Sequence, residues 1–119
     1  MADIAVLDDV LDAGIMVKRI LERKGHKVLV FSEEEDFLVH AKEHTLDLVI
    51  LDIKLKKMTG VEVLEELKNI RPEVKAIMLT GYPTLETARE SLKLGAVEYC
   101  VKPIDKDELE HKVESVLLS

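Results

Sequence analysis

The stretch Leu48-Val49-Ile50-Leu51-Asp52 places four apolar residues in a row directly before an acid. A continuous apolar run of this length is typical of a strand that is covered on both faces, as in a parallel sheet. Four similar runs along the chain predict four more strands: Ile4–Leu7, Val28–Phe31, Ala76–Leu79 and Val97–Val101. The last run contains Glu98, which an edge strand tolerates better than a central one.

Amphipathic segments separate these runs, and their apolar residues recur at the i+3 and i+4 spacing of one helix face. The five predicted faces consist of Met16, Val17, Ile20 and Leu21; Phe37, Leu38 and Ala41; Val63, Leu64, Leu67 and Ile70; Leu85, Ala88 and Leu92; and Leu109, Val113, Val116 and Leu117. Gly25, Pro72 and Gly95 are typical helix stops. Ser32 and the pair Asp105 and Glu108 predict helix N-caps.

Five strands alternating with five helices predict an α/β fold, with a parallel sheet and helices on both of its faces. The length of 119 residues fits one domain, residues 1–119. Hydrophobic residues make up 47% of the chain and charged residues 34%, which argues against disorder. The formal net charge of -7 argues against binding of nucleic acid or an anionic membrane by this domain.

The single cysteine, Cys100, cannot form an internal disulfide and fits a reducing compartment. Its apolar surroundings indicate a small buried hydrophobe rather than a redox centre. The chain opens on Met1-Ala2-Asp3 without a signal peptide, and no apolar run has the length of a membrane span. We therefore expect a cytoplasmic protein.

Reactive side chains follow four of the predicted strands: Asp8 and Asp9, Asp52, Thr80, and Lys102. In a sheet of order 2-1-3-4-5, known for one class of doubly wound folds, these four strands are neighbours and their carboxyl ends form the usual binding crevice. Three carboxylates together repel one another unless a cation offsets them, and Mg²⁺ prefers oxygen ligands. Asp is a competent nucleophile toward phosphorus, so the cluster predicts phosphoryl transfer that is assisted by Lys102 and Thr80.

Five short motifs occur in one order and spacing: Leu7-Asp8-Asp9, Ile50-Leu51-Asp52-Ile53, Met58-Thr59-Gly60, Leu79-Thr80-Gly81 and Val101-Lys102-Pro103. Together they resemble the receiver domains of two-component response regulators, the CheY-like superfamily, over essentially the whole chain. The resemblance implies a flavodoxin-like (βα)5 fold with a five-stranded parallel sheet in the order 2-1-3-4-5.

The resemblance also implies a role for each site residue. Asp52 matches the phosphoacceptor, Asp9 a direct Mg²⁺ ligand, Asp8 a ligand acting mainly through water, and Lys54 a ligand through its backbone carbonyl. Mn²⁺ is expected to substitute for Mg²⁺.

Further matches concern switching. Thr80 matches the switch hydroxyl, Tyr99 the aromatic that turns inward on activation, and Lys102 the lysine that binds the phosphoryl group. The Lys102-Pro103 bond is expected to be cis.

By the same resemblance, a sensor histidine kinase or phosphotransfer protein would donate the phosphoryl group. The surface of the fourth helix, fifth strand and fifth helix would then control an output domain, a transcriptional output included, or form a homodimer. No turnover of an external substrate is expected.

Two departures from the family stand out. Lys56 occupies the place of a frequent proline, so the loop Lys54–Met58 is expected to be more mobile, and the segment Val10–Gly14 lacks a frequent acid and proline.

Simpler interpretations exist for each residue alone: a solvated loop for Asp8 and Asp9, an N-cap for Asp52, a turn for Thr80, and a surface lysine for Lys102. They would have to hold at four strand ends at once. The histidines, which show no metal-ligand spacing, are interpreted as surface residues: His26, His40, His44 and His111. The run Glu33–Asp36 is interpreted as a solvated helix start.

Three rival functions remain. An Asp-nucleophile phosphohydrolase needs a second Asp two residues after the nucleophile as acid/base, where this chain has Lys54. A flavin-binding electron carrier needs backbone N–H donors after the first strand to bind the phosphate, but Asp8 and Asp9 at this place would repel a phosphate. A degenerate receiver that acts only as an interaction module would lack a site residue, and none is missing.

Overall fold

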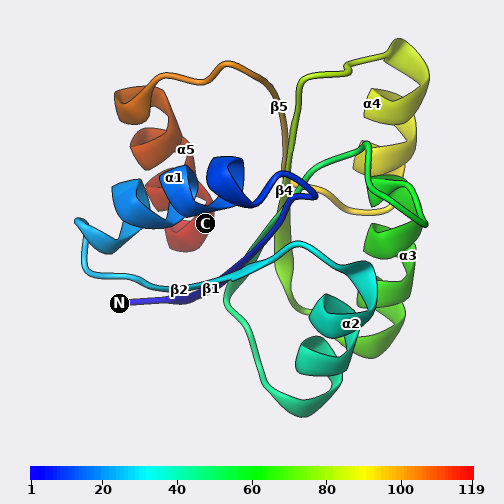
Figure 1. The fold of residues 1–119 in the computed structure, drawn as a ribbon, viewed down its shortest axis with the longest axis horizontal. Coiled ribbons are helices and arrows are strands. Elements are labelled where there is room, and N and C mark those ends of the chain that lie inside the picture. Colours follow the sequence, from blue (N-terminus) through cyan, green and yellow to red (C-terminus); the bar gives the residue numbers. More distant parts are fainter.

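The computed structural model describes all 119 residues as five strands and five helices that alternate along the chain (Figure 1). The strands are β1 (Asp3–Leu7), β2 (Lys27–Phe31), β3 (Leu48–Leu51), β4 (Lys75–Thr80) and β5 (Glu98–Val101). The helices are α1 (Leu11–Glu22), α2 (Glu34–Glu43), α3 (Gly60–Ile70), α4 (Leu85–Lys93) and α5 (Lys106–Leu118). The strands form one parallel sheet in the order β2-β1-β3-β4-β5. The predicted fold class and strand order are confirmed.

The sheet separates two hydrophobic cores. Figure 1 shows α1 and α5 on one side of the strands and α2, α3 and α4 on the other. Alternate residues of each strand point to opposite faces, so Val49 and Leu51 pack with the core under α2 and α3, while Leu48 and Ile50 pack under α1 and α5. Burial on both faces explains why the strand sequences are continuously apolar.

The helix faces agree with the sequence pattern except in α4 and at one residue of α1. Leu85 and Leu92 of α4 are 69% and 53% exposed, and Ser91 is the residue that this helix buries. The α4 helix lies beside the edge strand β5 and packs on α3, so it has less of the sheet to cover than the other helices. In α1, Met16 is exposed, while Val17 and Leu21 are buried.

The N-cap predicted at Ser32 is wrong, and the N-cap predicted at Asp105 is right in position but lacks the expected side-chain bond. Helix α2 begins at Glu34, one residue later than a Ser32 cap allows, and its N-cap residue Glu33 makes no side-chain cap bond. Asp105 is the N-cap residue of α5, but its side chain accepts no hydrogen bond. Thr59 caps α3 in a capping box with Glu62, and Thr84 caps α4.

The predicted stops at Gly25 and Gly95 are confirmed, because both glycines follow helices and have φ of 90° and 100°. The edge position of β5 is confirmed too, and its Glu98 side chain pairs there with Lys112. None of the five helices combines the length and the apolar character that crossing a membrane requires.

Candidate functional site

The carboxyl ends of β1, β3, β4 and β5 bring the predicted site residues to one edge of the sheet. Asp8 and Asp9 follow β1, Asp52 follows β3, Thr80 ends β4, and Lys102 follows β5. Carboxylate oxygens of the three aspartates lie within 4.8 Å of one another. The strand order is the cause, since these four strands are consecutive in the sheet.

Lys102 bridges two of the acids. Its Nζ lies 2.6 Å from Oδ2 of Asp8 and 3.1 Å from Oδ2 of Asp52. Burial by itself lowers the pKa of Lys102, but the hydrogen bonds and charges of Asp8 and Asp52 outweigh it, so the pKa lies above its ordinary value. The ammonium is therefore fully charged at neutral pH.

The three aspartates differ in how much of their hydrogen-bonding capacity is used. Oδ1 of Asp52 accepts the Ile53 N–H at 2.7 Å, and Oδ1 of Asp8 accepts the Val10 N–H at 2.9 Å. Both side chains are buried, whereas Asp9 is more exposed and accepts no hydrogen bond. Asp9 thus offers the carboxylate with the most freedom to bind a ligand.

The donor set fits a hard divalent cation. Oxygen atoms are the ligands that Mg²⁺ prefers, and three carboxylates gather here. The Lys102 ammonium pairs with two of these carboxylates and offsets one of their three formal negative charges. A divalent cation would neutralise the remaining two.

The remaining predicted residues surround this cluster. Thr80 is fully buried, and its Oγ1 accepts the Tyr82 N–H at 3.0 Å. The Lys54 ammonium lies 4.4 Å from the centre of the Tyr82 ring, and the Lys54 backbone pairs with Thr59. The Lys102-Pro103 peptide bond is cis.

Tyr99 of β5 is half-buried and contacts the start of α4. Its hydroxyl lies 2.7 Å from Oγ1 of Thr87 and accepts the Thr84 N–H at 3.4 Å. We expect Tyr99→Phe to lower the free energy of unfolding by about 1 kcal/mol, because the hydrogen bonds that the Tyr99 hydroxyl makes with Thr87 and with the Thr84 N–H are lost. Urea denaturation measures this change. Tyr82→Phe is the control, since the Tyr82 hydroxyl has no hydrogen-bond partner; an equal loss in both variants would contradict the prediction.

Sequence reasoning missed the role of Glu34. The sequence predicts a solvated helix start here, but Glu34 is only 2% exposed, and its carboxylate contacts the loop that follows Asp52. Burial raises the pKa of Glu34, but hydrogen bonds from the backbone of Lys57, Glu34 itself and Met58 outweigh it and bring the pKa below its ordinary value. No local pattern distinguishes this glutamate from its acidic neighbours.

The histidines are not all on the surface. His44 and His111 are exposed, whereas His26 and His40 are partly buried. The His40 ring stacks on His44, with centroids 4.4 Å apart, and also contacts Phe31. Burial, together with the neighbouring His44, lowers the pKa of His40.

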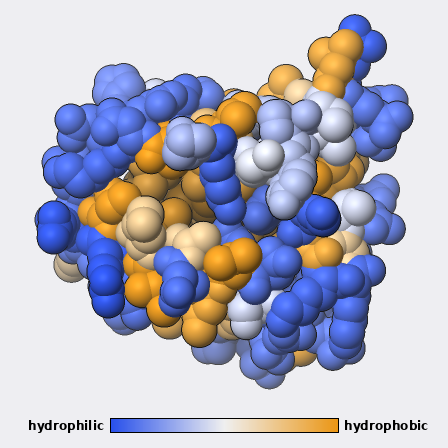
Figure 2. All heavy atoms as spheres, turned by 45° about the horizontal axis from the view of Figure 1, so that its top comes forward, coloured by the Kyte–Doolittle hydropathy of each residue, from blue (hydrophilic) through white to orange (hydrophobic).

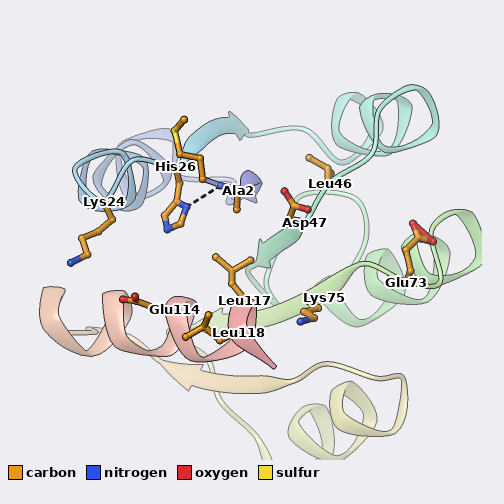
Figure 3. A pocket seen from close by; sticks show the side chains of 11 residues that line it. Ala2, Lys24, His26, Leu46, Asp47, Glu73, Lys75, Glu114, Leu117 and Leu118 are labelled. Carbon is orange, nitrogen blue, oxygen red and sulfur yellow. Dashed lines mark hydrogen bonds between the residues drawn. The ribbon is translucent and has the colours of Figure 1, made fainter.

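A separate hollow of about 610 Å³ lies at the opposite edge of the sheet, at the amino ends of the strands (Figure 3). The Ala2 N–H donates to Nδ1 of His26 there, and Lys75 donates to carbonyl oxygens at the end of α5. This hollow holds no cluster of metal-ligating groups comparable to the three aspartates. The candidate reactive groups therefore lie at the carboxyl edge of the sheet.

Figure 2 turns this carboxyl edge toward the viewer and shows hydrophobic side chains exposed among hydrophilic ones. Residues that follow β1 and β4 contribute to the exposed apolar surface: Val10, Leu11, Tyr82 and Leu85. The acidic cluster thus lies beside apolar side chains that are accessible to another protein.

Comparison with known proteins identifies relatives along nearly the whole chain. The family model of the response regulator receiver domain matches residues 4–114. The transcriptional regulatory protein ZraR of Escherichia coli (strain K12) is 33% identical over 115 residues, which cover 97% of this chain and 26% of ZraR. The chain thus spans about a quarter of the length of that relative.

Two solved structures resemble this chain in both fold and sequence. The CheY-like receiver domain protein from Methanospirillum hungatei superposes with a TM-score of 0.95 at 34% identity, covering 98% of this chain and 94% of that chain. The response regulator TrrA from Thermotoga maritima, solved in complex with Mg²⁺-BeF, has a TM-score of 0.87 at 32% identity, covering 98% and 99%. With the family model matching far more than half of its residues, the chain is a response regulator receiver domain, a phosphoacceptor module of two-component signal transduction.

Proposed function

We propose that Asp52 is the residue that accepts the phosphoryl group, with Lys102 and Thr80 assisting and Asp8, Asp9, Asp52 and the backbone carbonyl of Lys54 holding Mg²⁺. The observation that carries this proposal is the cluster itself: three carboxylates from two strand ends and the ammonium of Lys102 meet around Asp52. The complex of TrrA with Mg²⁺-BeF supports the choice of Mg²⁺, for which Mn²⁺ is a candidate substitute.

The reaction is an in-line displacement. A carboxylate oxygen of Asp52 attacks the phosphorus of a phosphohistidine, the new O–P bond forms as the N–P bond breaks, and the donor imidazole leaves. The Ile53 N–H holds the other oxygen and so orients the carboxylate. When bound, Mg²⁺ neutralises negative charge on the transferring group.

Lys102 and Thr80 act on the product. Once Asp52 is phosphorylated, the charged Lys102 ammonium exchanges a carboxylate partner for a phosphoryl oxygen, and the Thr80 hydroxyl turns from the Tyr82 N–H to donate to another oxygen. Movement of Thr80 changes the β4–α4 connection, whose Thr84 contacts the Tyr99 hydroxyl. Inward rotation of Tyr99 would then carry the change to α4, β5 and α5.

The partners follow from this mechanism. A sensor histidine kinase or phosphotransfer protein donates the phosphoryl group, in the cytoplasm, and the α4–β5–α5 surface contacts an output domain or a second copy of the chain. Exposed apolar residues are available on it: Leu85, Leu92, Val97 and Val101. The transcriptional relative ZraR favours a transcriptional output, while the negative net charge disfavours direct DNA contact by this domain.

The domain is not expected to turn over an external substrate. In the phosphohydrolase alternative a second acid would stand where Lys54 is, and that residue is an exposed lysine. A degenerate module would lack the acidic cluster or Lys102, and both are present.

Withdrawal of Mg²⁺ tests the proposal. Acetyl phosphate with Mg²⁺ is expected to add the mass of one phosphoryl group to the chain, and chelation with EDTA is expected to slow this by at least about 100-fold, because the metal contributes several kcal/mol. Intact-protein mass spectrometry measures the gain. Absence of any gain from either acetyl phosphate or a phosphohistidine donor, or an equal gain in EDTA, would overturn the assignment.

A further inference from the structure

The first residue of α2 reaches across to the loop that follows the proposed phosphoacceptor. Glu34 is 2% exposed, although its neighbours in the sequence are half-buried or exposed. One carboxylate oxygen, Oε2, accepts the Lys57 N–H at 2.5 Å and the Met58 N–H at 2.8 Å. A buried carboxylate is costly unless it is hydrogen-bonded, and here backbone donors of the β3–α3 loop supply those bonds.

The base and the tip of this loop are held in different ways. At the base, Lys54 pairs with Thr59, and the Gly60 N–H donates to the Ile53 carbonyl at 2.7 Å. At the tip, Lys57 and Met58 donate no backbone–backbone hydrogen bond. Glu34 is therefore the partner that satisfies both N–H groups at the tip.

A second acid of the same helix start holds the loop from outside. Nζ of Lys56 lies 2.5 Å from Oε2 of Glu33, and both side chains are substantially exposed. The start of α2 thus contacts the loop both through an exposed ion pair and through buried backbone hydrogen bonds.

We propose that Glu34 is a positioning residue for phosphoryl acceptance. By holding the loop tip through two hydrogen bonds, it keeps the Lys54 carbonyl directed to the metal site beside Asp52. The inference rests on the proposed function and adds to it a residue that touches neither the metal nor the phosphoryl group. It also links α2 to the chemistry at the end of β3.

Four variants of the 119-residue chain separate positioning from stability. Glu34→Ala removes both hydrogen bonds. Glu34→Gln keeps an oxygen that can accept both, since a single oxygen does so now, while Glu34→Asp keeps the charge but shortens the reach. Glu33→Gln is the matched control, because it removes one charge of the exposed Lys56 pair and leaves the loop backbone contacts in place.

Calorimetric titration with Mg²⁺ gives the main readout. Glu34→Ala and Glu34→Asp are expected to weaken Mg²⁺ binding by about 10-fold, as for other groups that orient metal ligands. Glu34→Gln and Glu33→Gln are expected to stay within about threefold of the parent chain. Amide hydrogen exchange at Lys57 and Met58 is expected to accelerate in the Ala and Asp variants and to change little in Glu34→Gln.

Two results would overturn the proposal. One is parent-like Mg²⁺ affinity in a folded Glu34→Ala variant whose Lys57 and Met58 amides exchange faster. The other is equally weak binding in Glu34→Gln with its amides still protected, since charge rather than the hydrogen bonds would then be responsible. If Glu34→Ala does not fold, Glu34→Asp takes its place in both comparisons. A parent chain that fails to accept a phosphoryl group refutes the proposed function instead.

Discussion

Asp52→Asn is expected to lower the rate of phosphoryl incorporation by at least about 1,000-fold, which is the scale of losing a group that acts directly in the chemistry. The amide is nearly isosteric with the carboxylate, and its oxygen can still accept the Ile53 N–H, but it is not a nucleophile at neutral pH. Asp52 as a whole is 6% exposed, so a replacement of the same shape avoids a cavity. The loss should therefore be chemical and not a failure to fold.

Mass spectrometry after incubation with acetyl phosphate and Mg²⁺ measures the effect, and circular dichroism verifies the fold. Asp12→Asn serves as the control: this acid lies near the site along the chain but is exposed on the first turn of α1, and its replacement should leave incorporation unchanged. If Asp52→Asn gained the same mass as the parent chain, the acceptor would have to be a different residue.

Gly60→Ala is expected to lower the free energy of unfolding by about 3 kcal/mol, the upper part of the usual range for overpacking. A Cβ at position 60 would lie 1.9 Å from the Asp52 carbonyl oxygen and 2.9 Å from the Ile53 Cα. Both atoms belong to the backbone, so no side chain can rotate away. Either the start of α3 or the end of β3 must move, and a displacement of β3 would carry Asp52 with it.

Urea denaturation measures this change, and Gly81→Ala is the matched control. Gly81 also belongs to a site motif, but the nearest atom to its added Cβ is the Cβ of Lys102 at 4.0 Å. We expect this control to change stability by at most about 1 kcal/mol. Equal stability losses in the two variants would refute the steric explanation.

The close approach of the first residue of α3 to the backbone of Asp52 and Ile53 thus explains why the motif Met58-Thr59-Gly60 ends in a glycine. The N–H of Gly60 donates to the Ile53 carbonyl at 2.7 Å, which draws the first residue of α3 against the end of β3. Together with the contacts of Glu34, this packing holds the backbone that follows Asp52 from two sides. If Asp52 accepts the phosphoryl group as proposed, such restraint would reduce the reorganisation that the reacting groups need when the donor arrives.

The apolar runs predict each strand end to within one residue, and the sequence also identifies the reactive residues that follow the strands. The helical pattern of α4 was less informative. Leu85 and Leu92 have helical spacing yet remain exposed, because spacing shows which residues share a face but not whether another element covers it. The N-cap predicted at Ser32 is wrong by one residue, since α2 begins at Glu34, whose carboxylate accepts the N–H groups of Lys57 and Met58.

The sequence by itself determined the five strands, the five helices and the positions of Asp8, Asp9, Asp52, Thr80 and Lys102 at strand ends, because apolar periodicity is a local property of the chain. Only the tertiary structure decided that Lys102 lies against Asp8, 94 residues away, and that Glu34 holds Lys57 and Met58. Contacts between distant segments depend on how the elements pack, and no local pattern specifies that packing.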